Sequence, residues 1–513
     1  MEQWTDEFGA KFEKDDNGAI SLLKVPENIT EYAIPDFVTK IGALAFSGRR
    51  GLTSVSIPNS VTKIGWGAFS DCCHLTNITI PDSVTEIGAS AFEFCKEITK
   101  IIIPKLVTII GDSAFEGCSK LTGIIVDADN QIFSSENGLL LNKDKSAVLY
   151  CGEGLTTVSI PDMVTEIGNT AFYRCLGLKN ITIPKSVTKI GEKAFSGCSG
   201  LKSISIPDSV SEIGVAAFAS CSGLTNIVIP NSVTKIGGSA FYGCKGLTSI
   251  YIPNSVTKIG KNAFCGCCNC TNIEVERDNT EYICKDGNLF NKQMTCLLFV
   301  KRNVSTYQIP DSVTEIGDAA FCDCIGLTNI NIPNSVAKIG NNAFRGCTNL
   351  TSITIPNSVT DIGNSAFSDC TNITSITIPN SVTEIGGAAF CGCSSLTNIT
   401  IPNSVTKIGR RTFGFCTGLT NIIIPDSITE IDHYTFSDCT TLTSITIPKS
   451  VTKIGRRAFG FCTGLTNIII PDSITEIDYD AFECCDNLVV HLSSKSSLKD
   501  DVFYPCTVIR DLP

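Results

Sequence analysis

A segment of 23 residues recurs through most of this chain of 513 residues and limits what the chain can fold into. The copy at residues 350–372 reads L-T-S-I-T-I-P-N-S-V-T-D-I-G-N-S-A-F-S-D-C-T-N. An Ile-Pro pair marks each of 17 copies, which form blocks of four, five and eight beginning at Pro35, Pro161 and Pro310. A fixed period of this size predicts a solenoid, because one repeat cannot bury its own apolar face and stacked neighbours can.

The pattern inside one copy predicts a strand followed by a return segment. Polar and apolar residues alternate from Ser352 to Ile355, as in a strand with one buried face. Pro356 ends the pairing because it has no N–H to donate. Gly363 is expected to adopt a backbone conformation that other residues resist, and Phe367 is expected to lie in a short helical turn on the far side.

The repeated string I-P-x-S-V-T-x-I-G-x-x-A-F-x-x-C resembles the BspA-like subclass of leucine-rich repeats, also called the TpLRR type. The resemblance covers nearly the whole chain, and all 17 copies carry Phe at the same place, from Phe46 to Phe482. It implies a leucine-rich-repeat α/β horseshoe, with a parallel concave sheet and short helical or irregular convex segments. It also implies a surface adhesin or another binding protein, and not an enzyme.

Two insertions of equal length and matching sequence interrupt the repeats. The step from Pro104 to Pro161 equals the step from Pro253 to Pro310, and the pattern of each insertion predicts a β-hairpin. Residues 12–35 look like a degraded copy of the same module. The predicted organisation is an N-terminal cap (1–34), repeats (35–126), a hairpin insert (127–154), repeats (155–275), a second hairpin insert (276–303), repeats (304–487) and a C-terminal cap (488–513).

Composition and charge exclude several classes of partner. The net charge of −11, with 18% charged residues, argues against nucleic acid and against an anionic membrane surface. No run of 18 apolar residues is present, so no membrane span is expected. The acidic start M-E-Q-W-T-D-E-F lacks the apolar core of a secretory signal, which slightly favours the cytoplasm. The family resemblance implies the cell surface or secretion instead.

The 27 cysteines mostly follow the repeat. Sixteen of them stand three residues after the repeat Phe, from Cys72 to Cys485, and are expected to form a ladder of buried, reduced thiols. Cys322 and Cys391 are expected to be surface thiols beside ladder cysteines. A thiolate metal site near the second insert is the alternative, but the spacing there is poor, so neither metal nor cofactor is expected. The residues considered for it are Cys265, Cys267, Cys268, Cys270, Cys284 and Cys296.

The three histidines, His74, His433 and His491, lie far apart and suggest no catalytic triad. The outward strand positions are mostly Ser, Thr and Asn, and such a surface either binds a partner or is simply solvated. A few of these positions are apolar. The hairpin inserts are expected to fold over Ile102, Ile125 and Tyr251. Cover of Ile469 by the C-terminal cap is left open as an alternative.

The candidate binding residues are Asn421, Ile423, Thr446, Asn467 and Ile469 on the concave face. Alternation sends Ile423 and Ile469 outward, two repeats apart with Thr446 between them; the alternative is drift after a duplication. The predicted function is a non-enzymatic, adhesin-like scaffold for a protein or a surface glycan. The alternatives are an enzyme or metal site carried by an insert or cap, and a purely structural, self-assembling protein. The ligand and the oligomeric state do not follow from the sequence.

Overall fold

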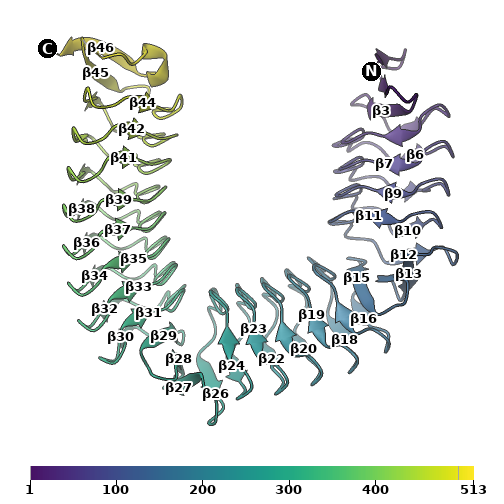
Figure 1. The fold of residues 1–513 in the computed structure, drawn as a ribbon, viewed down its shortest axis with the longest axis horizontal. Coiled ribbons are helices and arrows are strands. Elements are labelled where there is room, and N and C mark those ends of the chain that lie inside the picture. The colour runs from purple at the N-terminus through teal and green to yellow at the C-terminus, as the bar shows by residue number, and fades with distance from the viewer. Residues whose placement is uncertain (1, 495, 513) are drawn as a thin grey trace. The chain divides into compact units, whose positions relative to one another are not determined.

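The computed structural model describes residues 2–494 and 496–512 and divides the chain into two compact units. Residues 1–247 with 258–263 form the first unit, and residues 248–257 with 264–513 form the second. Met1, Lys495 and Pro513, which belong to the predicted caps, lie outside the described residues. Each unit is a β-solenoid in which successive turns of the chain stack through parallel strands (Figure 1).

One 23-residue repeat contributes two strands, where the sequence predicted one. In the copy around Pro356, these are β34 (Ser352–Thr354) and β35 (Asp361–Ile362). Between them the N–H of Val359 donates to the carbonyl oxygen of Pro356 at 3.0 Å and closes a tight turn. Each strand pairs with its equivalents one repeat before and after, so the 23-residue period becomes the spacing of two parallel ladders.

The strands equivalent to β34 occupy the same place in their repeats, although their sequences vary. In the second unit they are β24 (Ser249–Ile252), β26 (Asn272–Val275), β30 (Thr306–Gln308), β32 (Asn329–Asn331), β34, β36 (Ser375–Thr377), β38 (Asn398–Thr400), β40 (Asn421–Ile423) and β43 (Asn467–Ile469). In the first unit they are β4 (Glu31–Ala33), β6 (Ser54–Ser56), β8 (Asn77–Ile78), β10 (Lys100–Ile103), β12 (Gly123–Val126), β16 (Thr157–Ser159), β18 (Asn180–Thr182), β20 (Ser203–Ser205) and β22 (Asn226–Val228).

The strands equivalent to β35 are two residues long, and most begin with a charged residue. In the first unit they are β5 (Lys40–Ile41), β7 (Lys63–Ile64), β9 (Glu86–Ile87), β11 (Ile109–Ile110), β17 (Glu166–Ile167), β19 (Lys189–Ile190), β21 (Glu212–Ile213), β23 (Lys235–Ile236) and β25 (Lys258–Ile259). In the second they are β31 (Glu315–Ile316), β33 (Lys338–Ile339), β35, β37 (Glu384–Ile385), β39 (Lys407–Ile408), β41 (Glu430–Ile431), β42 (Lys453–Ile454) and β44 (Glu476–Ile477).

The return segment after β35 is irregular, and the helical turn expected at Phe367 does not form. Ser365 and Asp369 have φ values of 53° and 59°, which interrupt any helix. Instead the N–H of Phe367 donates to the carbonyl oxygen of Ala389 in the next repeat at 2.8 Å. Glycine is needed at position 363, but not because of an unusual backbone conformation, as the sequence predicted. A Cβ atom there would lie 2.6 Å from the carbonyl carbon of Gly340, so glycine is needed because stacked turns approach closely.

A stack of phenylalanine rings fills the core of each repeat block. Phe344 is fully buried, and its ring centroid lies 4.8 Å from that of Phe321 and 5.2 Å from that of Phe367. The rings are nearly parallel, an arrangement favourable for aromatic side chains. The recurring Phe therefore forms a ladder, which joins the turns within a block into one core.

The two inserts and the N-terminal cap share one topology, three antiparallel strands whose third strand starts a parallel ladder. The strands are β1 (Glu2–Thr5), β2 (Lys11–Lys14) and β3 (Ile20–Lys24) in the cap, β13 (Phe133–Glu136), β14 (Leu139–Asn142) and β15 (Ala147–Cys151) in the first insert, and β27 (Tyr282–Lys285), β28 (Asn288–Asn291) and β29 (Cys296–Phe299) in the second. Strands β3, β15 and β29 then pair in parallel with β5, β17 and β31. The predicted hairpins are present, and the cap resembles the inserts in structure as well as in sequence.

The C-terminal end of the second unit is covered by β45 (Val489–Ser493), the 3₁₀ helix η1 (Asp500–Phe503) and β46 (Thr507–Leu512). Phe503 is buried with its ring centroid 5.8 Å from that of Phe482, so it caps the phenylalanine stack. Among the described residues, η1 is the one helical element, and no helix is long and apolar enough to cross a lipid bilayer.

Candidate functional site

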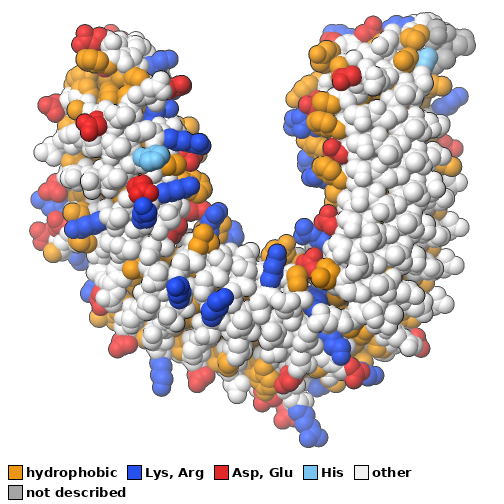
Figure 2. Space-filling view, turned by 180° about the vertical axis from the view of Figure 1, so that it is seen from behind, with side chains coloured by type: hydrophobic (Ala, Val, Ile, Leu, Met, Phe, Trp, Pro, Cys, Tyr) orange, Lys and Arg blue, Asp and Glu red, His pale blue; other side chains and the backbone are white. Residues whose placement is uncertain are grey.

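The outward side chains of β30, β32, β34, β36, β38, β40 and β43, together with Thr446, form a surface that we name the Ser/Thr face. Of these strands, β32 to β43 bury their middle residue, such as Ile376 or Ile399, and expose the two residues beside it, whereas Tyr307 in β30 is half-buried. The parallel register places Thr377 beside Thr400 and Thr400 beside Ile423. The face is rich in hydroxyl and amide groups. Figure 2 shows few charged side chains on the broad side of this unit that faces the viewer. That this sheet is the concave one stays a prediction.

Two isoleucines interrupt the polar column of the Ser/Thr face. The side chain of Ile423 is 66% exposed and that of Ile469 is 58% exposed, while Ile422 and Ile424 are buried. The strand alternation read from the sequence is therefore correct. Thr446 forms an isolated parallel bridge with Ile423 and is itself exposed, so it stands between the two isoleucines as predicted.

The sheet opens beside these residues. Thr446 makes a single bridge to Ile423, and the strand ladder resumes at β43, which pairs with β45. A groove of about 340 Å³ lies at this opening. Its lining residues are Ile445, Thr446, Ile447, Lys449, Asn467, Ile468, Ile469 and Pro471.

The sequence did not reveal this groove. The hexapeptide L-T-S-I-T-I at Leu442 is identical to the one at Leu350, which forms the regular strand β34. No local signal therefore distinguishes the open site from a closed one. What differs is the pair of neighbours, because the outward positions beside Thr446 are Ile423 and Ile469.

The candidate residues Asn421 and Asn467 are exposed at the start of β40 and β43. Asn421 lies in register with Asn398, and the side-chain amide of Asn467 donates to the hydroxyl of Thr466 at 3.3 Å and lines the groove. The structure thus brings all five predicted residues onto one surface. The C-terminal cap extends this surface through His491, in register with Ile469, but leaves Ile469 exposed.

The hairpin inserts do not cover the other outward apolar residues, contrary to expectation. Ile102 and Ile125 are paired neighbours in β10 and β12 and remain exposed, as does Tyr251 in β24. The inserts cannot fold over them because their third strand continues the ladder of two-residue strands. Exposed apolar side chains are therefore not confined to Ile423 and Ile469. The groove, however, is lined by Ile469 and by Thr446, the bridge partner of Ile423.

The cysteine ladder is buried and reduced, as predicted, and it also has a hydrogen-bonding role. The thiol of Cys370 donates to the carbonyl oxygen of Phe344 at 3.1 Å. Equivalent bonds of 3.0–3.2 Å recur along both units. Burial raises the pKa of Cys439 to about 12, which keeps this thiol protonated at neutral pH. The ladder thiols therefore satisfy buried carbonyl groups.

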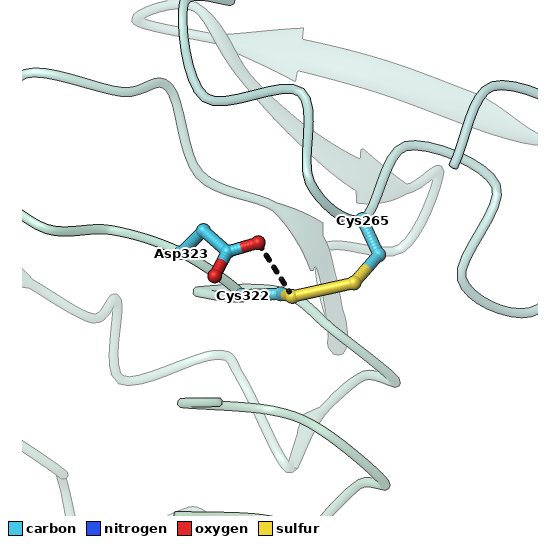
Figure 3. A group of neighbouring side chains, drawn as sticks. All are labelled: Cys265, Cys322 and Asp323. Atoms are coloured by element: carbon cyan, nitrogen blue, oxygen red, sulfur yellow. Dashed lines mark hydrogen bonds between the residues drawn. A yellow bond between two sulfur atoms is a disulfide. The ribbon is translucent and has the colours of Figure 1, made fainter. Parts of the chain in front are cut away.

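A disulfide between Cys265 and Cys322 departs from the prediction that the thiols are free (Figure 3). Both residues are buried, so the expectation of a surface thiol at Cys322 was wrong. The two cysteines are 57 residues apart and occupy the same position of two repeats on either side of the second insert. Their Cα atoms lie 5.6 Å apart, so the structure brings together two residues that the second insert separates in the sequence.

The first insert buries an acidic side chain that the sequence gave no reason to single out. A carboxylate oxygen of Glu153 accepts hydrogen bonds from the N–H of Gly117 at 2.7 Å and from the hydroxyl of Tyr150 at 3.4 Å. Burial raises the pKa of Glu153 to about 7. The second insert has Arg302 at the equivalent position, buried with its guanidinium 4.3 Å from the ring centre of Phe299.

Comparison with solved structures finds leucine-rich repeat proteins from bacteria. A leucine rich cell surface protein from Faecalibacterium prausnitzii is 26% identical, with 87% of this chain and 94% of that chain covered and a TM-score of 0.46. The pneumococcal vaccine antigen PcpA is 17% identical, with 100% and 99% covered and a TM-score of 0.42. The T. pallidum leucine rich repeat protein is 23% identical, with 53% and 89% covered and a TM-score of 0.25. No match is found among the curated proteins.

The family comparison covers nearly all of the chain. A model of the BspA type leucine rich repeat region matches residues 24–137, 145–285, 293–400 and 383–510. These relatives give no support to the cytoplasmic location that the N-terminal residues favoured. The match confirms the resemblance read from the repeat string, and the chain belongs to the BspA-type leucine-rich repeat family.

Proposed function

We propose that this protein is a non-enzymatic scaffold that binds a protein partner on the Ser/Thr face, at Ile423, Thr446 and Ile469. The observation that carries the proposal is a pair of exposed isoleucines on an otherwise polar sheet. Ile469 lines the groove, and Ile423 pairs with Thr446, which also lines it. Exposed apolar surface next to a concavity is typical of interaction sites, because its burial on binding releases water.

The lining of the groove favours a protein over a glycan. Five of its eight residues are Ile or Pro, and its polar members are Thr446, Asn467 and Lys449. Apolar side chains of a partner fit such a surface, whereas a hydroxyl-rich sugar would lose water without gaining enough hydrogen bonds. The same lining argues against an enzyme, since Lys449 is its single titratable group and general acid–base chemistry needs several groups converging.

The family resemblance leads us to place this scaffold at the cell surface or outside the cell. Protease treatment of intact cells tests this location. Loss of the full-length chain while a cytoplasmic marker survives is the expected result, and protection of both until the cells are lysed would contradict it.

Site-specific photo-cross-linking of the full chain tests the binding site. A photoreactive residue replaces Thr446 in one variant and Thr354 in a matched control, which has the same hexapeptide and the same outward position on β34. We expect a protein adduct at position 446 but not at 354. The cross-linked partner is then purified and must compete for the site at position 446. Equal adducts at both positions, an adduct with a second copy of the chain, or binding to immobilised glycans alone would contradict the proposal.

A further inference from the structure

Cys265, Cys322 and Asp323 place three potential metal ligands in one small volume of the second unit (Figure 3). Their two sulfur atoms and one carboxylate oxygen all lie within 4.8 Å of one another. The sulfur of Cys322 lies 3.5 Å from Oδ2 of Asp323. Cys265 and Cys322 form a small buried cluster with Ala319, separate from the main core of the unit.

The fold of the insert does not require these residues. The first insert forms the same three strands and the same parallel continuation, yet its equivalent positions are Glu116 and Tyr173. The module therefore folds without a cysteine pair and an aspartate at these positions.

The role of the ladder cysteines does not explain the pair either. Ladder thiols stand three residues after the repeat Phe and donate to a buried Phe carbonyl, as Cys347 does to Phe321. Cys265 and Cys322 directly follow their Phe residues, at a position that holds Ser, Glu, Gly, Tyr, Ala or Arg in most repeats. Cys391 is the other cysteine at this position, and its neighbours in the stack are Ser368 and Gly414.

We propose that Cys265, Cys322 and Asp323 form a redox-gated site for a thiophilic divalent cation of the zinc class. In the oxidised protein the sulfur atoms are bonded to each other and the site is closed. A dithiol reductant opens it: the S–S bond breaks, two thiols form, and the reductant closes to its own disulfide. The cation then displaces one proton from each thiol and is held by two thiolates and the carboxylate.

The donor set and its geometry suit zinc. Zn–S bonds of about 2.3 Å and Zn–O bonds of about 2.0–2.2 Å in a tetrahedron put the ligand atoms roughly 3.5–4 Å apart. The three ligands therefore need small adjustments once the sulfur–sulfur bond is broken. The Cα atoms of the two cysteines are 5.6 Å apart. Asp323 is half-buried, so its carboxylate offers an approach from solvent, and the fourth position is left to water.

Metal counting on the reduced and oxidised full chain tests the site. The chain is reduced with dithiothreitol, desalted without oxygen, titrated with Zn²⁺ against a chelating indicator, and analysed for bound zinc. We expect about one equivalent more in the reduced than in the oxidised protein. Co²⁺ in place of Zn²⁺ should give sulfur-to-metal charge-transfer absorption in the reduced protein alone.

Variants separate this site from adventitious binding to other thiols. Cys265→Ser and Cys322→Ser should lose the extra equivalent, and Asp323→Asn, which keeps both sulfurs, should bind at least about tenfold more weakly. Cys391→Ser and Asp369→Asn are matched controls, and both should bind like the wild type. Asp369 has a φ of 59°, close to the 57° of Asp323, but it follows a serine. Equal zinc in both redox states, or an extra equivalent that survives Cys322→Ser or is unaffected by Asp323→Asn, would overturn the proposal.

Discussion

The hydroxyl of Tyr150 donates a 2.7 Å hydrogen bond to the carbonyl oxygen of Phe115 at the junction between the first repeat block and the first insert. Within the block this type of carbonyl accepts from a ladder thiol, as that of Phe92 does from Cys118. The insert thus supplies a tyrosine where the next repeat would have supplied a cysteine. The first insert can therefore interrupt the solenoid without leaving the carbonyl of Phe115 unsatisfied, because it brings its own donor.

Tyr150→Phe should loosen this junction. The substitution leaves the Phe115 carbonyl without its donor, and an unsatisfied buried group costs about 1–3 kcal/mol. Hydrogen exchange of residues 115–153 should become correspondingly faster, while exchange in the third repeat block stays unchanged. Tyr251→Phe, which alters an exposed tyrosine, is the control. If Tyr150→Phe exchanges hydrogen at the wild-type rate, the bond contributes nothing to the stability of the junction.

Glu153 should make the stability of the first unit depend on pH. Its pKa is raised from 4.5 to about 7 in the folded state, so the folded chain holds this proton more tightly than the unfolded chain. The free energy of unfolding should therefore fall as pH rises from about 4.5 to about 7, by at most about 3 kcal/mol. Glu153→Gln should flatten this slope in urea titrations, whereas Glu31→Gln at an exposed position should not. An unchanged slope in Glu153→Gln would assign the pH dependence to other groups.

Phe344→Ala should create a cavity in the middle of the phenylalanine stack. Phe344 is fully buried between Phe321 and Phe367, and loss of such a ring costs about 3–5 kcal/mol. Limited proteolysis should then cleave near residues 321–367 sooner than in the wild type. Phe415→Ala removes a partly exposed ring and should have a much smaller effect. Equal protease resistance of Phe344→Ala and the wild type would mean that the stack does not hold the turns together.

Thiol counting tests the redox state of the chain. The structure has 25 free cysteines and one disulfide, and most of the free thiols are buried. A bulky maleimide should label few thiols in the native protein, about 25 after denaturation without reductant, and 27 after reduction. A count far below 25 in the denatured, unreduced protein would indicate disulfides along the ladder.

The periodic features of this fold could be predicted from the sequence, and features that depend on which repeats touch could not. Alternation correctly placed Ile422 inside and Ile423 outside, and all 17 repeats share the Phe whose rings form the stack. The two-residue strands such as β35 are too short to leave a periodic signal. Predicting the Cys265–Cys322 disulfide requires knowing that two residues 57 positions apart meet across an insert. Glu153 carries no sequence signal, because acidic residues are rarely buried.

The most direct test of the proposed function is the dissociation constant of the partner identified by cross-linking, measured for three forms of the full chain. Ile423→Ser with Ile469→Ser should weaken binding by about tenfold or more while the melting temperature stays within a few degrees, because both side chains are exposed. Val228→Ser, which changes an exposed valine at the equivalent strand position of the first unit, should bind like the wild type. A double variant that melts normally and binds with the wild-type dissociation constant would contradict the account.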